Sequence, residues 1–467
     1  MTEVETARIS PVALELADDL LRLRAKVQAP GLVCVDLPRA LFGEVAAWNE
    51  HQLRAAATVS WEEPGQDIHL FGFGEALALN GSGRDALATA APAVREAAAR
   101  VHVGAVASEA RPRFFGGARF DPDSPHRDPV WDAFGAWRFV LPEIIVATKR
   151  GKLSASLTLA LGADQTREEV AIAVVAAVAR VVAPPSPSQN GATHRYERTG
   201  PDAPQWCDAV SQALAEIGEG RYRKAVLALQ VRCVSETPHN VAATLYQLAD
   251  RYDACFVFGF RAGGSSWVGA SPELLVSLEG GVVRASSLAG TCARGADDIE
   301  DRRLADELLG STKEQSEHEL VVRATRQALA PLCDELAVPE TPQLMQMADI
   351  QHLHTPVEGV AAAGVDLFEV LLAMHPTPAV GGWPTAPALE AIGRLEGMDR
   401  GWYSGPIGWI DMNGEGAFAV ALRSALLREG EALLYAGAGI VEGSDPRGEL
   451  AETELKLHPL LEALRGG

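Results

Sequence analysis

Paired runs of strand-forming residues, separated by short turns, constrain the fold of this chain more than any other feature. The runs are CFVFGF (255–260) with SSWVGA (265–270), ELLVSLE (273–279) with VVRASSL (282–288), and the series GPIGWIDM (405–412), GAFAVALRSALL (416–427) and ALLYAGAG (432–439). Runs that follow one another so closely predict antiparallel pairs. Strands and helices do not alternate strictly, so a parallel sheet is not indicated. We therefore expect an α+β fold, with large antiparallel sheets packed face to face and helices on the outside.

A stretch rich in proline, serine and glycine divides the chain. Residues 183–204 read APPSPSQNGATHRYERTGPDAP, a composition typical of an exposed connection. We expect an N-terminal part (1–183) that contributes strands and helices to the same body, an exposed connection (184–204) and a C-terminal domain (205–467).

Local patterns predict several elements within these two parts. Residues 138–161 are rich in strand formers and carry an Arg150-Gly151-Lys152 turn, which predicts a strand hairpin, and a helix should follow at 168–182. Apolar residues recur at helical spacing over 206–217 and stop at Gly218, after which Lys224 opens a strand.

Composition excludes several classes of protein. The chain has 467 residues with 47% hydrophobic and 22% charged residues, enough to form a core. Its formal net charge of -21 makes the average surface repel nucleic acid and anionic membranes, so an anionic substrate needs a local positive site. The six cysteines include no C-x-x-C pair, which fits reduced thiols in a cytoplasm. The N-terminus does not resemble a signal peptide, and the apolar run 170–182 is too short to span a bilayer.

Residues 433–456, LLYAGAGIVEGSDPRGELAETELK, are predicted to end a buried strand and begin a helix. Gly437 and Gly439 should let the backbone turn sharply and approach a ligand closely. Asp445 and Pro446 are typical of an N-cap and a first helical residue. The spacing is not G-x-G-x-x-G, and no Gly-Lys-Ser/Thr follows, which argues against a dinucleotide site or a P-loop.

The helix predicted after Asp445 would carry three charged groups on one face. Glu449, Glu452 and Lys456 fall at i, i+3 and i+7, which places two carboxylates and an ammonium together. That combination suits a divalent metal beside a carboxylate substrate. The alternative is an ordinary hairpin turn followed by a solvated ion pair between Glu452 and Lys456.

Further motifs that could carry chemistry are distributed in order along the C-terminal domain. They are Lys224, Ser271-Pro272-Glu273, Ala289-Gly290-Thr291, Glu314 with Glu317 and His318, His352-Leu353, HPTPAVGG (375–382), Tyr403 and Arg423. Their order and spacing resemble the chorismate-utilising enzymes, and within them the isochorismate synthases. The resemblance covers the chain after Trp206. It extends more weakly into 116–122 and 137–146, which look like the N-terminal strands of menaquinone-type members.

The resemblance implies a Mg²⁺-dependent, reversible reaction in which water attacks C2 of chorismate while the C4 hydroxyl leaves. Such an exchange needs a base and an acid on opposite faces of the ring. By position, Lys224 matches the family's general base and Glu273 its general acid, and burial could shift both pKa values toward neutrality. The structural alternatives are a lysine lying along a strand edge and a glutamate in the first turn of a helix.

The resemblance also implies a metal site. Glu317 and Glu452 match the family's ligands, and Glu449 and Glu314 are placed nearby as water-mediated partners. Mg²⁺ prefers a few carboxylates with several waters and a substrate oxygen. Glu314 could instead complete a capping box with Ser311.

The two carboxylates of the substrate are assigned by the same resemblance. The residues expected to bind the enolpyruvyl carboxylate are Tyr403, Arg423 and the amides of Gly437, Ala438 and Gly439. The residues expected to lie near the ring carboxylate are Gly290, Thr291, His352 and Lys456. The planar guanidinium of arginine suits a carboxylate because it binds it through two hydrogen bonds. His352 could instead be a structural histidine, and His354 would share its face on a strand.

Three positions select the reaction within the family. Anthranilate synthases look to have glutamine at the position of Lys224, aminodeoxychorismate synthases a nucleophilic lysine at Ala289, and salicylate synthases a threonine at Ala379. The residues present favour isochorismate as product and require no amidotransferase subunit, so we expect a monomer. The alternatives are a salicylate synthase, a non-catalytic chorismate-binding module and a nucleotide-binding protein. The pathway stays open between menaquinone, a siderophore and salicylate.

Overall fold

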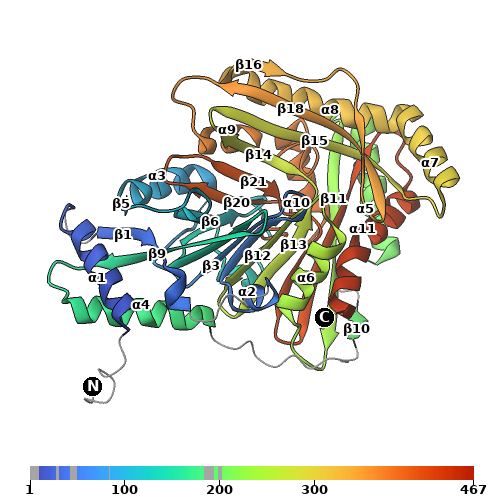
Figure 1. Ribbon diagram of the computed structural model, residues 1–467. Helices are drawn as coiled ribbons and strands as arrows, with labels where there is room; N and C mark the ends of the chain where they lie inside the picture. Colours follow the sequence, from blue (N-terminus) through green and yellow to red (C-terminus); the bar gives the residue numbers. More distant parts are fainter. Residues whose placement is uncertain are drawn as a thin grey trace.

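Two large β-sheets packed against each other, with helices on their outer faces, form the molecule (Figure 1). The computed structural model describes residues 10–27, 31–42, 50–83, 85–182, 194–197 and 202–466. The predicted α+β fold with antiparallel sheets is confirmed. Most of the connection predicted at 184–204 lies outside the described residues.

Sheet A contains strands from both parts of the chain, and every pair in it is antiparallel except β1 with β5. Its hydrogen-bonded order is β10 (His194–Glu197), β11 (Lys224–Ser235), β23 (Glu431–Val441), β22 (Ser424–Arg428), β13 (Ser265–Ser271), β12 (Phe256–Ala262), β2 (Val59–Glu63), β3 (Ile68–Phe73), β8 (Ile144–Lys149), β9 (Lys152–Leu161), β1 (Gly31–Asp36) and β5 (Val101–Val103), with β19 (Gly382–Trp383) also paired to β11.

Sheet B likewise draws on both parts of the chain. Its order is β16 (Cys333–Ala337), β18 (Ile350–Ala361), β15 (Val282–Ala293), β14 (Leu274–Glu279), β21 (Gly416–Val420), β20 (Pro406–Asp411), β6 (Arg113–Ala118), β7 (Trp137–Leu141) and β4 (Leu77–Gly81), with β17 (Gln343–Gln346) paired to β18.

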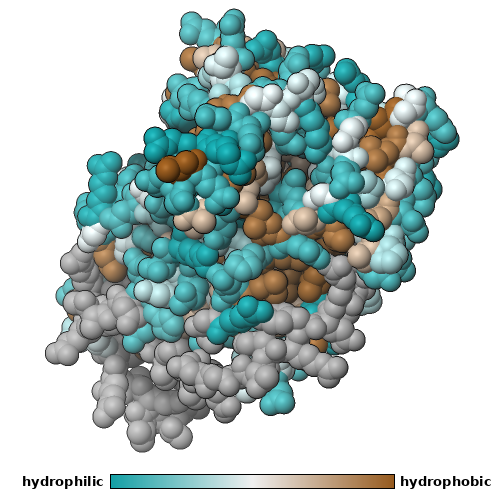
Figure 2. Space-filling view, turned by 90° about the vertical axis from the view of Figure 1, so that its right-hand side faces the viewer, coloured by the Kyte–Doolittle hydropathy of each residue, from teal (hydrophilic) through white to brown (hydrophobic). Residues whose placement is uncertain are grey.

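Helices cover the outer faces of the two sheets (Figure 1). They are α1 (Pro11–Arg24), α2 (Glu50–Ala56), α3 (Ala86–Ala99), α4 (Arg167–Val182), α5 (Ala203–Gly218), α6 (Val241–Arg251), α7 (Asp298–Gly310), α8 (Thr312–Leu329), α9 (Leu367–Met374), α10 (Thr385–Leu395) and α11 (Pro446–Gly466). Helix α11 packs on β23 and α8 on β15, so one helix from each sheet's covering layer lies beside the site described below. On the face drawn in Figure 2, hydrophilic residues predominate and apolar ones gather in a few areas.

The strands are rich in apolar residues because sheet A is buried on both faces. Trp267 of β13 faces the interior between the sheets, where its ring lies 4.9 Å from that of Trp131. The next residue, Val268, packs in a separate hydrophobic cluster on the other face of the sheet, because successive side chains of a strand point to opposite faces. Phe134 and Trp402 extend the interior cluster with ring centroids 5.3 Å apart. This aromatic core fixes the separation of the sheets.

The chain passes from one sheet to the other at two places that matter for the site. Pro272 and Glu273 connect β13 of sheet A to β14 of sheet B, and residues 421–423 connect β21 of sheet B to β22 of sheet A. The run GAFAVALRSALL is therefore two strands, with Arg423 at the break in a left-handed conformation (φ 45°). Arginine adopts this region rarely, so the surrounding structure must hold it there.

Two local expectations need correction. The run 138–161 is not one hairpin, because residues up to Leu141 belong to sheet B and only β8 and β9 form the hairpin around Arg150 and Gly151. Gly437 and Gly439 do not form a turn, because β23 continues unbroken through both of them while paired to β11. The turn comes instead after Val441, before α11.

Candidate active site

One cavity lies where the two crossovers meet β11, β23 and the two helices α8 and α11. It is lined by Val226, Pro272, Glu273, Leu288, Ala289, Gly290, Thr291, Glu317, His352, Ala379, Val380, Tyr403, Ser404, Leu422, Arg423, Tyr435, Ala436, Gly437, Gly439, Glu452 and Lys456. Among the predicted site residues, all but Lys224, Ala438, Glu314 and Glu449 are in this lining. Segments as far apart as 226 and 456 thus converge on one space.

The glycines of β23 leave room on the strand face that carries the site. Gly439 pairs with Val226 and Gly437 with Ala228, so both glycines share a face with Lys224. A Cβ on Gly439 would lie 2.2 Å from an oxygen of Glu317. The glycines are therefore required for close approach of side chains, rather than for a turn.

Ala438 lies on the opposite face of β23. It is buried in the hydrophobic core beneath the helices and does not line the cavity. Successive strand residues alternate between faces, so the side chain of Ala438 points away from the face of its two glycine neighbours, while the role expected for its backbone amide stays a prediction.

Lys224 is completely buried at the start of β11, and its Nζ lies 2.9 Å from Oε1 of Glu317. Burial alone would raise the pKa of Glu317, but the lysine outweighs it and the pKa is lowered. Lys224 does not line the cavity itself, yet its partner Glu317 does, so its amine lies just behind the cavity wall.

Glu273 has the properties of a general acid. It is 2% exposed, and its Oε1 has no hydrogen-bond partner among the described residues. Burial raises its pKa to about 8, although Lys224 and Lys456 oppose the shift. The carboxyl group is therefore protonated at neutral pH and faces a cavity. Its position between two strands of different sheets excludes the alternative of a helical first turn.

Carboxylates and lysines are paired along the edge formed by α8 and α11. Lys456 Nζ lies 2.6 Å from Glu452 and 3.1 Å from the carbonyl oxygen of Gly437. Lys313 Nζ lies 2.9 Å from Glu449 and 3.2 Å from Glu314. Burial, and then the neighbouring carboxylates, raise the pKa of both Glu314 and Glu449. Four carboxylates (Glu314, Glu317, Glu449 and Glu452) are paired here with three lysines (Lys224, Lys313 and Lys456), so one negative charge is in formal excess. An added cation would balance it.

Glu314 is not held in the predicted capping box. Ser311 does cap α8, accepting the Glu314 amide at 3.3 Å, but the amide of Ser311 donates to Leu308 rather than to the Glu314 carboxylate. The carboxylate instead lies near Gly290, where an added Cβ would be 3.1 Å from Oε2 of Glu314. Glu314 thus supports the cavity wall from behind.

The carboxylates of this site do not form a closely gathered metal cluster. Among the described residues, the one group of three or more such ligands within 4.8 Å of each other is Glu50, Glu62 and His69, elsewhere in the molecule. Glu317 and Glu452 are the two predicted ligands that line the cavity. A hard cation that keeps several waters fits two such oxygen ligands.

Arg423 is buried, and no carboxylate of the described residues forms an ion pair with it. Its guanidinium donates to Nε2 of His352 at 2.9 Å and contacts Sδ of Met347 at 3.2 Å. Because Nε2 accepts, Nδ1 of His352 carries the proton and is hydrogen-bonded to the Gly290 carbonyl (3.2 Å) and Thr291 (3.0 Å). Burial and Arg423 hold the pKa of His352 well below its usual value. His352 therefore orients Arg423, whose charge is free for an anionic ligand.

Some lining residues were not predicted from the sequence. Tyr435 stacks on Tyr403 with ring centroids 5.3 Å apart, and Val226, Val380 and Leu422 form apolar walls. Val226 and Tyr435 share the strand face of Lys224, Gly437 and Gly439, so strand alternation could have identified them. Val380 and Leu422 lie in loops, where the sequence carries no such signal.

The comparisons with known proteins place the chain in a family. The family described as chorismate binding enzyme matches residues 19–465. This chain is a chorismate-binding enzyme. Among its relatives, the "Salicylate biosynthesis isochorismate synthase" of Pseudomonas aeruginosa is 39% identical over 91% of this chain and 87% of the relative. "Isochorismate synthase MenF" of Bacillus subtilis is 36% identical over 76% of this chain and 75% of the relative.

Solved structures agree with this family membership. The menaquinone-specific isochorismate synthase MenF of Escherichia coli matches with a TM-score of 0.76 and 26% identity, over 97% of this chain and 100% of that structure. The "putative 2,3-dihydroxybenzoate-specific isochorismate synthase, DhbC" of Bacillus anthracis matches with a TM-score of 0.71 and 28% identity, over 92% of this chain and 99% of that structure. In the part of this chorismate-binding enzyme that is described, no helix is both long and apolar enough to cross a membrane.

Proposed function

We propose that this protein is an isochorismate synthase, which interconverts chorismate and isochorismate by attack of water at C2 with loss of the C4 hydroxyl. The observation that carries the proposal is a single cavity lined by Glu273, a buried carboxyl group with a pKa raised to about 8, with the buried amine of Lys224 directly behind the cavity wall. The relatives named as isochorismate synthases support the same reaction.

The two groups are assigned complementary proton transfers. Lys224 would accept the proton of the attacking water, and Glu273 would donate its proton to the departing C4 hydroxyl. In the reverse direction their roles exchange. Arg423 and Lys456 would bind the two carboxylates of the substrate, since both are cations that line the cavity, Arg423 buried and Lys456 with 22% of its side chain exposed. Tyr403, which lines the same cavity, would contact the enolpyruvyl carboxylate together with Arg423.

A Mg²⁺ ion fits the carboxylates of α8 and α11. Glu317 and Glu452 would hold it directly, and Glu449 and Glu314 would act through water. The fit rests on the oxygen-only ligands and on the formal excess of the four carboxylates over the three lysines paired with them. When bound, the ion would neutralise and orient the ring carboxylate of the substrate.

A salicylate synthase is the second candidate, because one relative carries the words "Salicylate biosynthesis" in its name. Ala289 leaves the space for water open, and the small Ala379 favours release of isochorismate over pyruvate elimination. All the site residues belong to 205–467, which we assign as the catalytic domain, with 1–183 completing the sheets. Water as nucleophile requires no amidotransferase subunit, so we propose that the protein acts as a monomer.

The direct test is to incubate the pure protein with chorismate and Mg²⁺ and separate the products by chromatography. Isochorismate without salicylate or pyruvate is the expected result. Stoichiometric pyruvate with salicylate would establish the second candidate. Unchanged chorismate, in protein that binds it, would identify a non-catalytic module.

Removal of the divalent ion should abolish turnover. Exhaustive chelation is expected to stop isochorismate formation, and added Mg²⁺ should restore it. Glu452→Gln should raise the Mg²⁺ concentration for half-maximal activity about tenfold or more, because a neutral amide is a poor ligand for a hard cation. The matched control is Glu454→Gln on the same helix, since Glu454 does not line the cavity. Full activity after chelation would contradict the metal assignment.

Arg423→Lys should raise the KM for chorismate about 100-fold, because lysine keeps the charge but loses the two hydrogen bonds that arginine makes to one carboxylate. Each tenfold step corresponds to about 1.4 kcal/mol of binding free energy. Steady-state kinetics would measure the change. Arg113→Lys is the matched control: Arg113 is equally buried, with 7% exposed, but lines a different cavity between the sheets. An unchanged KM in Arg423→Lys would remove Arg423 from substrate binding.

A further inference from the structure

Strand β11, which carries Lys224, is paired incompletely along one of its edges. Its other edge pairs with β23 from Lys224 to Val234. On the incomplete edge, β19 pairs with residues 224–225 and β10 with residues 232–235. Between them, no strand of the described chain hydrogen-bonds to this edge. The residues of the gap are buried except Gln230, which is half-buried, so their backbone groups require other partners.

Two charged side chains occupy this gap. Arg400 donates from Nη2 to the carbonyl oxygen of Val226 at 2.6 Å, and Glu396 accepts the amide of Ala228 at 2.7 Å. The two side chains are also joined to each other, with Nη2 and Oε1 2.5 Å apart. One donor and one acceptor are thereby supplied to the strand edge, as a neighbouring strand would supply them.

The same pair extends to two other walls of the cavity. Arg400 donates from Nη1 to the carbonyl oxygen of Val380 at 3.0 Å, and its guanidinium lies 5.9 Å from the ring centre of Tyr403. Val226, Val380 and Tyr403 all line the cavity. The side chains of Arg400 and Glu396 are 4% and 3% exposed, so water does not compete for these contacts.

We propose that Glu396 and Arg400 are a positioning pair that fixes the β11, Val380 and Tyr403 walls of the active site relative to one another. Neither side chain lines the cavity, so the pair acts through these walls. Arginine is required because only its planar fork reaches Val226, Val380 and Glu396 at once. As far as turnover is concerned, the inference rests on the proposed isochorismate synthase activity.

The test is Arg400→Lys, assayed well below its melting temperature after circular dichroism has verified that the variant is folded. We expect kcat/KM to fall about 100-fold, because small displacements of catalytic walls have effects of this size. Hydrogen exchange should also speed up at the Ala228 amide and over residues 377–381. Glu396→Gln, which keeps an acceptor for Ala228 but removes the charge, is expected to lower kcat/KM about tenfold and serves if the lysine variant does not fold.

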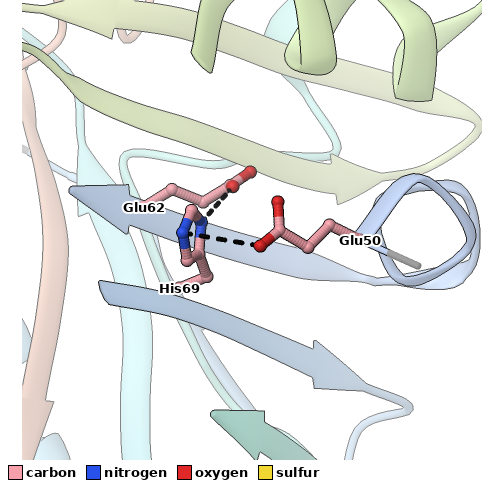
Figure 3. Close-up of side chains that lie close together, drawn as sticks. All are labelled: Glu50, Glu62 and His69. Atoms are coloured by element: carbon pink, nitrogen blue, oxygen red, sulfur yellow. Dashed lines mark hydrogen bonds and ion pairs between the residues drawn. The ribbon is translucent and has the colours of Figure 1, made fainter. Parts of the chain in front are cut away.

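The matched control is a second buried arginine–glutamate pair that is not in the active site. Arg54 donates to both oxygens of Glu62, at 2.9 and 2.5 Å, and Glu62 also contacts His69 at 2.7 Å beside Glu50 (Figure 3). None of these residues lines the catalytic cavity. Arg54→Lys should lower the melting temperature while leaving kcat and KM unchanged, which is the behaviour of a purely structural pair.

The outcomes separate the inference from the proposed function. Wild-type kcat, KM and exchange rates in a folded Arg400→Lys variant, or kinetic losses equal to those of Arg54→Lys, would overturn the positioning role. If the wild-type protein forms no isochorismate, the proposed function fails instead. The positioning role is then decided by hydrogen exchange and by chorismate affinity, and unchanged values in the variant would overturn it.

Discussion

Replacing Lys224 with alanine should lower kcat for isochorismate formation about 10³-fold or more while the protein still binds chorismate. The physical reason is that water at neutral pH is a poor nucleophile, and a positioned base contributes up to about 10⁴-fold to such a reaction. Lys224 is the amine placed for this task, completely buried and 2.9 Å from Glu317. Rapid-quench product analysis with saturating chorismate and Mg²⁺ would measure the loss.

Two comparisons make the Lys224 result specific. Lys224→Met fills the space of the side chain without an amine, so it should be as inactive as the alanine variant and more stable. Titration of chorismate against intrinsic fluorescence should give a dissociation constant within about threefold of wild type, since Arg423 and Lys456 remain. Near wild-type turnover in either variant would remove Lys224 from the mechanism.

Glu273→Gln is expected to lower kcat about 10³-fold, because an amide cannot protonate the departing C4 hydroxyl. Its shape and burial are otherwise preserved, so KM should change little. Burial raises the pKa of Glu273 to about 8 in the folded protein. In the wild type, kcat should therefore fall about tenfold per pH unit above about pH 8, as Glu273 loses its proton, and the glutamine variant should lack this limb.

The same pKa shift predicts that Glu273→Gln, which lowers kcat, makes the folded protein more stable at alkaline pH. A carboxyl whose folded pKa is raised stabilises the fold fully below its unfolded pKa and loses that contribution as the pH rises toward 8. Glu273→Gln removes this loss, so the variant should melt at a higher temperature than wild type at pH 8 to 9, measured by calorimetry. A lower melting temperature would indicate that Glu273 is ionised and paired, and it would exclude the acid role.

The sequence was sufficient for elements that follow local rules. The hairpin at Arg150-Gly151, the strand that begins at Lys224 and the helix that begins at Pro446 are where the pattern predicted them. Each depends on residues within a few positions, namely glycines at positive φ, a proline at a helix start and apolar residues at a fixed period. The order of the motifs that resemble the family predicted most of the residues that line the cavity.

Residues 437–439 show where a local rule was misleading. Glycines usually mark turns, but Gly437 and Gly439 lie within a continuous strand. They are glycines because Tyr403 and Glu317 occupy the space that a side chain at each position would need. The amide of Ala438 was assigned to the substrate, which stays a prediction, and its side chain faces the core. The partners that decide these positions are distant in sequence, so no local pattern contains them.

By itself, the sequence determined the fold class, the identity of the family and most of the residues that gather at the site, because strand and helix periodicity and motif order are properties of the chain. Only the tertiary structure decided which charges are paired and which are free. Lys224 is paired with Glu317, and Oε1 of Glu273 is buried with no hydrogen-bond partner in the described part of the chain. Arg400 and Glu396 together occupy the edge of β11. Burial and pairing set the pKa values and positions of these groups, and both arise only when segments far apart in the chain meet.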